Sequence, residues 1–220
     1  MTSFVRRLDA NQLGRDFVVG DVHGCFDELS VELKGLSFDR EIDRLFSVGD
    51  LVDRGPDSAA VIEWLTQPWF YAVRGNHEQM ALDYLVGDLD SRDYQKYGGA
   101  WFLELSPQEQ RRIAAQFDVL PIVLEVKTSS GLVGIVHGDC PFASWAELIA
   151  ELNGDDALLV ADACLYSRER ITANDESGVA GLAKMFVGHT PVQRPILLGN
   201  VHYIDTGAVF GSRLTVTQIN

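Results

Sequence analysis

Apolar runs alternate with amphipathic segments over the first third of the chain. Continuous apolar runs bounded by turn residues are typical of strands that are covered on both faces. Between the first two runs, residues 26–35 place leucines on one helical stripe. Pro56 stands where it can open a second helix that runs to about Leu65. The pattern predicts a βαβαβ unit, with strands expected at 16–19, 44–48 and 70–73.

The remaining two thirds change from helical to extended patterns. A capping box at Ser106–Glu109 predicts a helix that runs to about Phe117, and a second box at Ser144–Glu147 predicts another. We predict one domain over residues 1–220, with a βαβ front half and a back half rich in antiparallel strands. The strands expected in the back half are 122–126, 132–136, 185–187, 196–198, 201–204 and 214–218, with turns at 129–131 and 199–200.

Composition and charge narrow the class of protein. The chain has 220 residues, 46% of them hydrophobic and 23% charged, which is ordinary for one globular domain. Its net charge of −14 and the lack of a basic run argue against nucleic-acid partners. No apolar run approaches the roughly 20 residues of a membrane helix, so no membrane partner is expected, and no secretory signal is visible. Three cysteines make a poor disulfide framework, so we expect reduced thiols and a cytoplasmic location.

Each predicted early strand is followed by residues that can bind metal ions, set beside glycine. The runs are Gly-Asp-Val-His-Gly at 20–24, Gly-Asp-Leu-Val-Asp-Arg-Gly at 49–55 and Arg-Gly-Asn-His-Glu at 74–78. They are separated by about one strand–helix–strand unit each time, so the ligands should meet at one edge of a sheet. Metal ligands beside arginines predict a metal site that handles phosphate.

Two further histidines extend this pattern. His137 and His189 each follow a predicted strand, so four of the five histidines stand where a strand passes into a loop. Any one such position, taken alone, is more often a histidine satisfied within the fold or an aspartate that makes a turn. Five such junctions in one chain favour a metal site over that structural explanation.

The combined motif set resembles the phosphoprotein phosphatase family of metallophosphatases. It is most similar to bacteriophage lambda protein phosphatase and the bacterial serine/threonine protein phosphatases. The resemblance implies an α/β calcineurin-like metallophosphatase fold, with a central β-sandwich of mixed sheets flanked by helices. The segments that carry it are GDVHG, GDLVDRG, RGNHE, HGD at 137–139 and GHTP at 188–191, supported by 69–80, 167–171 and 203–210.

The resemblance implies two metal ions. A bridging carboxylate can hold two divalent ions about 3.5–4 Å apart, the arrangement used for in-line phosphoryl displacement. Mixed oxygen and nitrogen ligands suit Mn, Fe or Zn better than Ca or Mg, and Mn²⁺ is expected, with Fe or Zn left open. In this sequence the implied ligands are Asp21 and His23 for the first metal, Asp50 for both, and Asn76, His137 and His189 for the second.

The resemblance also implies roles for the residues between these ligands. His77 would be the general acid that protonates the leaving alkoxide, and Asp53 would orient it. The alternative for Asp53 is a helix cap near Pro56. A water or hydroxide between the metals would be the nucleophile, so no phosphoenzyme is expected.

Three arginines match the phosphate clamp of the family. Arg54, Arg74 and Arg168 would each offer a planar guanidinium to the tetrahedral oxyanion. For Arg168 the alternative is a solvated helix face formed with Arg170, and spacing alone does not choose between these two arginines.

The leading functional hypothesis is a metal-dependent phosphomonoester hydrolase acting on phosphoserine and phosphothreonine in proteins or peptides, extending to phosphotyrosine. The first alternative is a symmetrical dinucleoside polyphosphate hydrolase, a class that resembles this chain in GDVHG and in a GNH motif but diverges at the second motif, where Asp53 stands here. A second alternative is an inactive interaction module, in which some of the metal-ligand residues would be replaced. None of the expected ligand residues is replaced in this sequence. Residues 206–211 lead straight into the last expected strand, and this resemblance to the short bacterial and phage members of the family implies an open site and no dedicated regulatory subunit.

Overall fold

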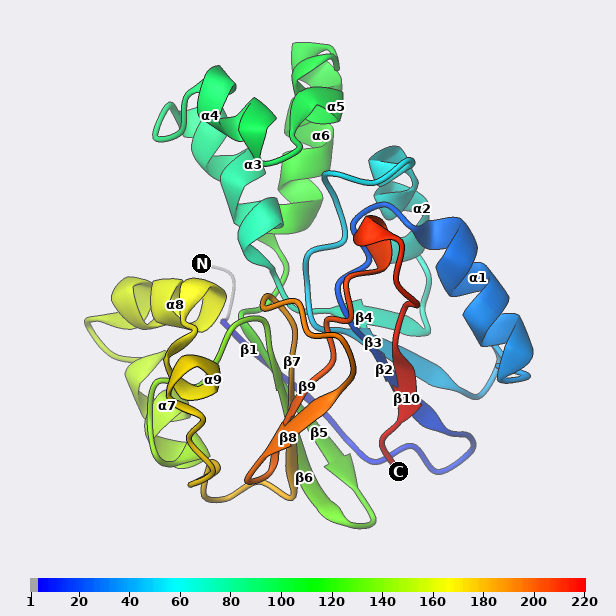
Figure 1. Ribbon diagram of the computed structural model, residues 1–220, viewed down its shortest axis with the longest axis vertical. Helices are drawn as coiled ribbons and strands as arrows, with labels where there is room; N and C mark the ends of the chain where they lie inside the picture. The colour runs from blue at the N-terminus through cyan, green and yellow to red at the C-terminus, as the bar shows by residue number, and fades with distance from the viewer. Residues whose placement is uncertain (1–3) are drawn as a thin grey trace.

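Two β-sheets pack face to face between layers of helices in the computed structural model, which describes residues 4–220 (Figure 1). Residues 1–3 of the predicted domain lie outside the described residues. The four-stranded sheet runs β10 (Val216–Gln218), β2 (Asp16–Val19), β3 (Arg44–Ser47), β4 (Phe70–Ala72). The six-stranded sheet runs β1 (Val5–Leu8), β5 (Val123–Thr128), β6 (Gly131–Val136), β7 (Lys184–Val187), β9 (Val201–Tyr203), β8 (Ile196–Leu198).

Three apolar clusters define the layers. The inner cluster lies between the two sheets and joins side chains such as Phe46 of β3 and Phe186 of β7. A second cluster packs α1 (Phe26–Gly35) and α2 (Val61–Leu65) on the outer face of the four-stranded sheet. A third packs α7 (Trp145–Glu151) and α8 (Ala157–Tyr166) on the outer face of the other sheet. The sheet faces are therefore buried on both sides, which explains their continuous apolar runs.

The predicted front half is confirmed. Strands β2, β3 and β4 pair in parallel, and α1 has the predicted bounds. The second helix differs from the prediction, because the chain after Pro56 first makes a 3₁₀ turn, η1 (Ser58–Ala60), before α2 begins. The side chain of Asp57 caps this turn by accepting a backbone hydrogen bond of 3.2 Å. Asp57, and not Asp53, is therefore the cap near Pro56.

The back half contains the predicted antiparallel pairs, including β10 with β2, but it also contains parallel pairs that were not predicted. The two predicted hairpins are present, with β5 antiparallel to β6 and β8 antiparallel to β9. However, β6 pairs in parallel with β7, and β7 with β9. The segment between β6 and β7 contains α7, α8 and α9 (Glu169–Ala173), which is long enough for the crossover that parallel pairing requires. Strand β1, which pairs in parallel with β5, was not predicted.

Four helices form a separate layer above the strand ends in Figure 1: α3 (Asn76–Val86), α4 (Ser91–Lys96), α5 (Ala100–Leu103) and α6 (Pro107–Asp118). The capping box at Ser106 is present, because its hydroxyl accepts from the N–H of Glu109 while the Glu109 carboxylate accepts from the N–H of Ser106. All three cysteines are free and buried. Within residues 4–220, no helix is both long and apolar enough to cross a lipid bilayer.

A buried carboxylate before β3 gives a pH-dependent test of the fold. Asp43 accepts hydrogen bonds of 2.7 and 2.6 Å from Arg15 and of 3.0 Å from the N–H of Asp39. Burial alone would raise the pKa of Asp43, but these partners lower it below its ordinary value. Asp43→Asn should therefore lower the free energy of unfolding by about 1–3 kcal/mol at neutral pH.

A group whose pKa is depressed by folding contributes stability above its unfolded pKa, and the contribution disappears as the pH falls through the folded value. The difference between wild type and Asp43→Asn should therefore shrink below about pH 4. Urea unfolding at neutral and acidic pH measures both values. Asp93→Asn, which removes an exposed ion pair with Lys96, is the control and should change little. A constant difference across the pH range would contradict the charged role of Asp43.

Candidate metal centre and catalytic site

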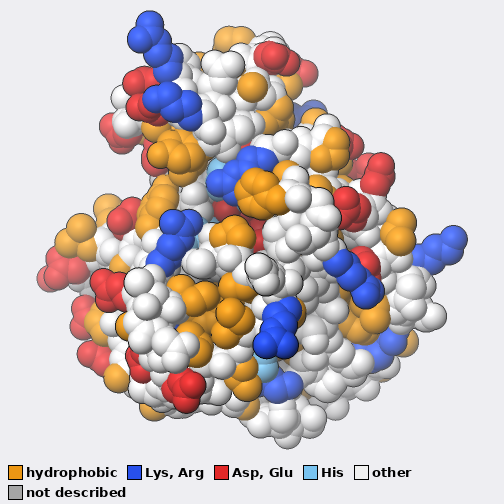
Figure 2. Space-filling model, in the orientation of Figure 1, with side chains coloured by type: hydrophobic (Ala, Val, Ile, Leu, Met, Phe, Trp, Pro, Cys, Tyr) orange, Lys and Arg blue, Asp and Glu red, His pale blue; other side chains and the backbone are white. Residues whose placement is uncertain are grey.

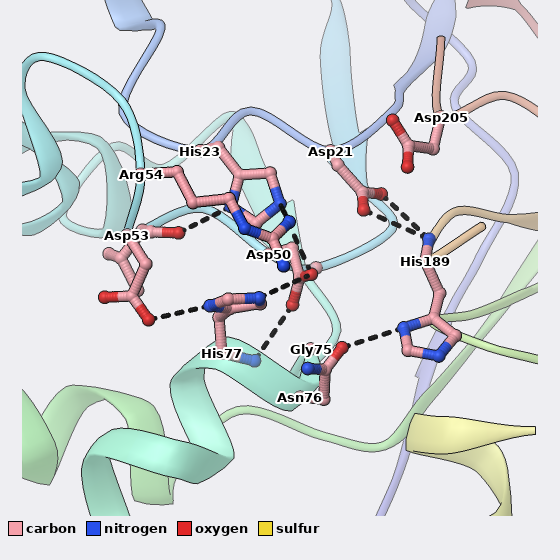
Figure 3. A network of polar contacts seen from close by, with 12 residues as sticks. Asp21, His23, Asp50, Asp53, Arg54, Gly75, Asn76, His77, His189 and Asp205 are labelled. Atoms are coloured by element: carbon pink, nitrogen blue, oxygen red, sulfur yellow. Dashed lines mark hydrogen bonds and ion pairs between the residues drawn. The ribbon is translucent and has the colours of Figure 1, made fainter. Parts of the chain in front are cut away.

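The loops after five parallel strands converge on one buried cluster (Figure 3). Strands β2, β3 and β4 of one sheet and β6 and β7 of the other each end beside it. Every predicted metal ligand, and His77 with them, is at most 8% exposed. Among the described non-glycine residues, seven have positive φ, and five of them lie in this site: His23, Asp50, Asp53, Arg54 and His189. Backbone strain is thus concentrated here, as at many functional sites.

Asp50 lies at the centre of the cluster. Its Oδ1 is 3.2 Å from Nε2 of His137, and its Oδ2 is 3.6 Å from Nε2 of His23 and 3.8 Å from Nε2 of His77. Burial alone would raise the pKa of Asp50, but the surrounding histidines, His137 foremost, hold it well below its usual range. The carboxylate is therefore charged, and its two oxygens face imidazole nitrogens on two sides.

The histidines are oriented by backbone carbonyls. Nδ1 of His23 lies 2.7 Å from the carbonyl oxygen of Val52, and Nδ1 of His137 lies 2.7 Å from that of Val48. A neutral imidazole has one N–H, so donation from Nδ1 of His23 leaves the lone pair of its Nε2 on the side of Asp50. Nε2 of His137 lies on the same side. Metal-binding histidines are commonly oriented in this way.

Asn76 joins the two remaining histidines. Its Oδ1 lies 2.9 Å from Nε2 of His137 and 2.8 Å from Nδ1 of His189. Burial lowers the pKa of His23 and of His189 to about 3, so both rings are neutral and offer a lone pair. Burial would also lower the pKa of His137, but Asp50 beside it raises the value, so this position favours positive charge.

Asp21 lies beside a carboxylate that the sequence reasoning did not single out. Its oxygens accept hydrogen bonds of 3.2 and 3.1 Å from the N–H of His189, and Asp205 lies next to it (Figure 3). Burial, and then Asp205 and Asp50, raise the pKa of Asp21 well above its usual range. Buried carboxylates so close together need a proton or a cation between them. Asp205 follows β9 directly, so the strand-end rule that found the other ligands could have found it.

Two groups of buried side chains within the described residues could each hold an ion. The ligand atoms of His23, Asp50 and His77 lie within 4.8 Å of one another, as do those of Asp50, His137 and His189. Asp50 belongs to both groups. The mixture of carboxylate oxygens and imidazole nitrogens suits transition-metal ions. The residues present therefore fit two neighbouring metal ions that share one carboxylate.

His77 pairs with Asp53 inside the protein. Nδ1 of His77 lies 2.7 Å from Oδ2 of Asp53, and both side chains are fully buried. The other oxygen of Asp53 accepts from Trp101 at 2.6 Å and from Tyr94 at 3.3 Å. No motif signalled either of these two aromatic residues. Nε2 of His77 is buried without a hydrogen-bond partner and faces Asp50 at 3.8 Å, so it is a buried polar atom that still lacks a ligand or proton acceptor.

Arg54 and Arg168 are exposed, whereas Arg74 is buried. Nη1 of Arg54 lies 2.6 Å from Nε2 of His23, and Arg168 donates a hydrogen bond of 3.4 Å to the carbonyl of His189. Both therefore lie next to the cluster. Arg170, the competing candidate, is buried and donates to Asp139 at 3.0 Å, so it does not belong to a solvated helix face.

Arg74 is held by the protein itself. Its guanidinium donates to Gln79 at 2.9 Å and to the carbonyls of Asp118 and Leu120, at 2.6 and 3.5 Å, at the end of α6. These bonds tie the third motif to α6 through the two Nη atoms, and the buried Nε of Arg74 has no hydrogen-bond partner. Of the three arginines predicted to bind phosphate, Arg54 and Arg168 thus lie exposed at the rim of the cluster, and Arg74 is buried.

Glu78 connects the second and third motifs, although the sequence reasoning gave it no role. Its carboxylate accepts from the N–H groups of Asp50, Leu51 and Gly75 at 3.0, 2.8 and 2.8 Å. Burial, and then Asp50, raise the pKa of Glu78 to about 7. Glu78 therefore fixes the backbone that carries Asp50.

Comparison with known proteins identifies the family. The model of the calcineurin-like phosphoesterase family matches residues 17–203. The chain belongs to this family. As a calcineurin-like phosphoesterase it is a hydrolase, and members of the family use a binuclear divalent metal centre. The family, fold class and enzymatic nature predicted from the sequence are confirmed, and the candidate ligands are those described above.

Named relatives of this calcineurin-like phosphoesterase fall into two groups. It is 40% identical to serine/threonine-protein phosphatase 1 of Salmonella typhimurium, covering 97% of this chain and 96% of that protein. It is 28% identical to the asymmetrical bis(5′-nucleosyl)-tetraphosphatase PrpE of Bacillus velezensis, covering 90% of this chain and 86% of that protein. A solved structure described as a candidate diadenosine tetraphosphatase superposes with a TM-score of 0.67 at 22% identity, over 98% of this chain and 93% of the other, and supports the fold.

Proposed function

We propose that this phosphoesterase is a protein phosphatase that hydrolyses phosphoserine and phosphothreonine, and by extension phosphotyrosine, in protein substrates. The observation that carries the proposal is the buried pair of His77 and Asp53 beside Asp50. A serine or threonine alkoxide is a poor leaving group and needs a proton donor, whereas a nucleotide leaving from a polyphosphate needs one far less. The 40% identity to a serine/threonine-protein phosphatase supports the same substrate class.

We propose that the ligands predicted from the sequence hold the two ions. When bound, the ions would polarise the phosphoryl oxygens and activate a water molecule for attack. The buried carboxylates and the oriented Nε2 atoms support this assignment, and Mn²⁺ is the proposed metal, with Fe or Zn as alternatives. Asp21 and His23 would hold the first ion, Asp50 both, and Asn76, His137 and His189 the second. Asp21 belongs to neither group of converging ligand atoms, and His77 takes its place in the first group.

The other site residues would bind the phosphate and move a proton. Arg54 and Arg168, which lie at the rim, would hold the phosphoryl oxygens. Arg74, the third predicted clamp residue, positions the third motif through its Nη atoms and would have only its buried, unpartnered Nε left for the phosphate. His77 would give its Nε2 proton to the leaving oxygen while Asp53 keeps the ring oriented.

We also propose that residues 1–220 form one domain, since the two sheets share the inner apolar cluster. Under the proposed function, phosphoproteins and phosphopeptides are the substrates that bind at the site. The cytoplasmic location and the absence of nucleic-acid, membrane and regulatory-subunit partners remain predictions from the sequence.

A second candidate is hydrolysis of a dinucleoside tetraphosphate. The relative at 28% identity supports it, although that relative carries the name of the asymmetrical enzyme and the sequence reasoning named the symmetrical one. Both substrates place a phosphoryl group between metal ions and arginines, so the cluster alone accommodates either.

One assay separates the two candidates. Manganese-loaded protein is given phosphoserine peptides and diadenosine tetraphosphate side by side, with Asp50→Asn as the background control. We expect a higher kcat/KM on the peptides. A higher kcat/KM on the dinucleotide would overturn the proposal in favour of the second candidate.

A further inference from the structure

An aromatic ring stands in solvent at the rim of the metal cluster. Phe210 is 66% exposed, and its ring centroid lies 5.9 Å from the guanidinium carbon of Arg54. Arg54 in turn contacts His23 of the cluster. On this face of the molecule, basic and hydrophobic side chains border a recess in which acidic and histidine side chains are visible (Figure 2). A single exposed phenylalanine is common, but this ring lies against the arginine that is proposed to bind phosphate, so a substrate bound there would meet it.

The turn that carries Phe210 is held in place by the site. It is the short 3₁₀ segment η2 (Ala208–Phe210), which lies between Gly207 at φ 71° and Gly211 at φ 87°. The N–H of Gly207 donates to Asp205 at 2.9 Å, and the N–H of Phe210 donates back to Gly207 at 2.9 Å. Asp205 lies beside Asp21, so the ring is tied to the metal cluster through one buried carboxylate.

Arg54 is confined on its other side by the turn between α4 and α5. Its N–H lies 3.4 Å from the carbonyl of Gly98, and a Cβ at Gly98 would lie 2.5 Å from that nitrogen. Arg54 is thus placed between this turn and the ring of Phe210. A phosphate bound by Arg54 would therefore have Phe210 as its apolar neighbour.

We propose that Phe210 is a specificity-determining residue that binds an apolar side chain directly beside the phosphorylated residue of a peptide substrate. Consecutive Cα atoms of a peptide are about 3.8 Å apart, so when the phosphate is on Arg54 the adjoining side chain falls within reach of the ring. Contact with an apolar side chain removes the exposed ring from water. The inference rests on the proposed phosphatase function and adds a sequence preference to it.

The test compares phosphoserine peptides that differ only in the residue next to phosphoserine, leucine or glycine, on each side in turn. The enzymes are wild type, Phe210→Ala and Phe210→Leu, with Leu197→Ala as the control, because Leu197 is 56% exposed on β8 and outside the site. Wild type should prefer a leucine-flanked peptide by roughly tenfold in kcat/KM, as expected for one apolar contact. The preference should vanish in Phe210→Ala, persist largely in Phe210→Leu and persist fully in Leu197→Ala.

Several outcomes would overturn the inference. If Phe210→Ala lowers kcat/KM equally on both peptides and on p-nitrophenyl phosphate, the ring only positions Arg54. If the loss is confined to diadenosine tetraphosphate, the ring binds a base. Wild type that cleaves both peptides equally would remove the inference and leave the proposed function intact. Wild type that cleaves no phosphopeptide but cleaves the dinucleotide would instead remove the proposed function.

Discussion

Replacing Asp50 with asparagine should reduce phosphatase activity by roughly 10³-fold or more, since the loss of even one preorganised contact at a reacting group costs about 10²–10³-fold. Asp50 faces His23, His77 and His137 and belongs to both candidate metal groups. An amide keeps the shape but removes the negative charge that two cations would share. The metal content after dialysis should fall for both ions together, as measured by elemental analysis.

The control for Asp50→Asn is Asp155→Asn, which changes the net charge by the same amount at an exposed position. This control should bind metal and hydrolyse phosphate esters as wild type does. An Asp50→Asn protein that keeps two ions and full activity would exclude the shared-carboxylate arrangement. Circular dichroism of the metal-free proteins separates a local loss of charge from a failure to fold.

Replacing His77 with asparagine should lower kcat on alkyl phosphates by about 10²–10⁴-fold, the usual contribution of a positioned general acid. Nε2 of His77 is buried and unpartnered, while Nδ1 is held by Asp53. Aryl phosphates have better leaving groups and should lose much less. Parallel assays on phosphoserine and p-nitrophenyl phosphate measure the difference.

Metal analysis of the same variant tests another role for His77. The atoms of His77 could join His23 and Asp50 around an ion, in which case His77→Asn would lose metal. The general-acid role requires that the metal content stay at the wild-type value. Equal loss of activity on alkyl and aryl phosphates, together with loss of metal, would assign His77 as a ligand. Asp53→Asn should follow His77→Asn in its substrate dependence, because Asp53 acts through the ring.

Much of the site could be predicted because its residues stand a few positions after the ends of strands. Asp21, Asp50 and Asn76 come after β2, β3 and β4, and the carboxyl ends of parallel strands share one edge. His137 and His189 follow the same rule in the second sheet. Their roles as ligands remain proposals, but their convergence is a property of the fold.

Residues whose role depends on distant partners could not be predicted. Tyr94 and Trp101 carry no motif and reach Asp53 only because α4 and α5 fold over the strand ends. The family resemblance already favoured Arg168 over Arg170, but the ion pair that occupies Arg170, with Asp139 of another loop, is visible only in the structure. These contacts join segments about 30 to 50 residues apart, beyond what local periodicity reports.

The sequence by itself supplied the candidate chemistry of this protein: possible metal ligands and arginines placed after short apolar strands, in motifs whose resemblance indicated the calcineurin-like family. Local patterns can do this because strand ends and caps are set by neighbouring residues. Only the tertiary structure decided that β6, β7 and β9 run in parallel, which brings His137, His189 and Asp205 to the edge where Asp21 and Asp50 lie. Strand direction depends on crossovers and on packing between the two sheets, which no short segment contains.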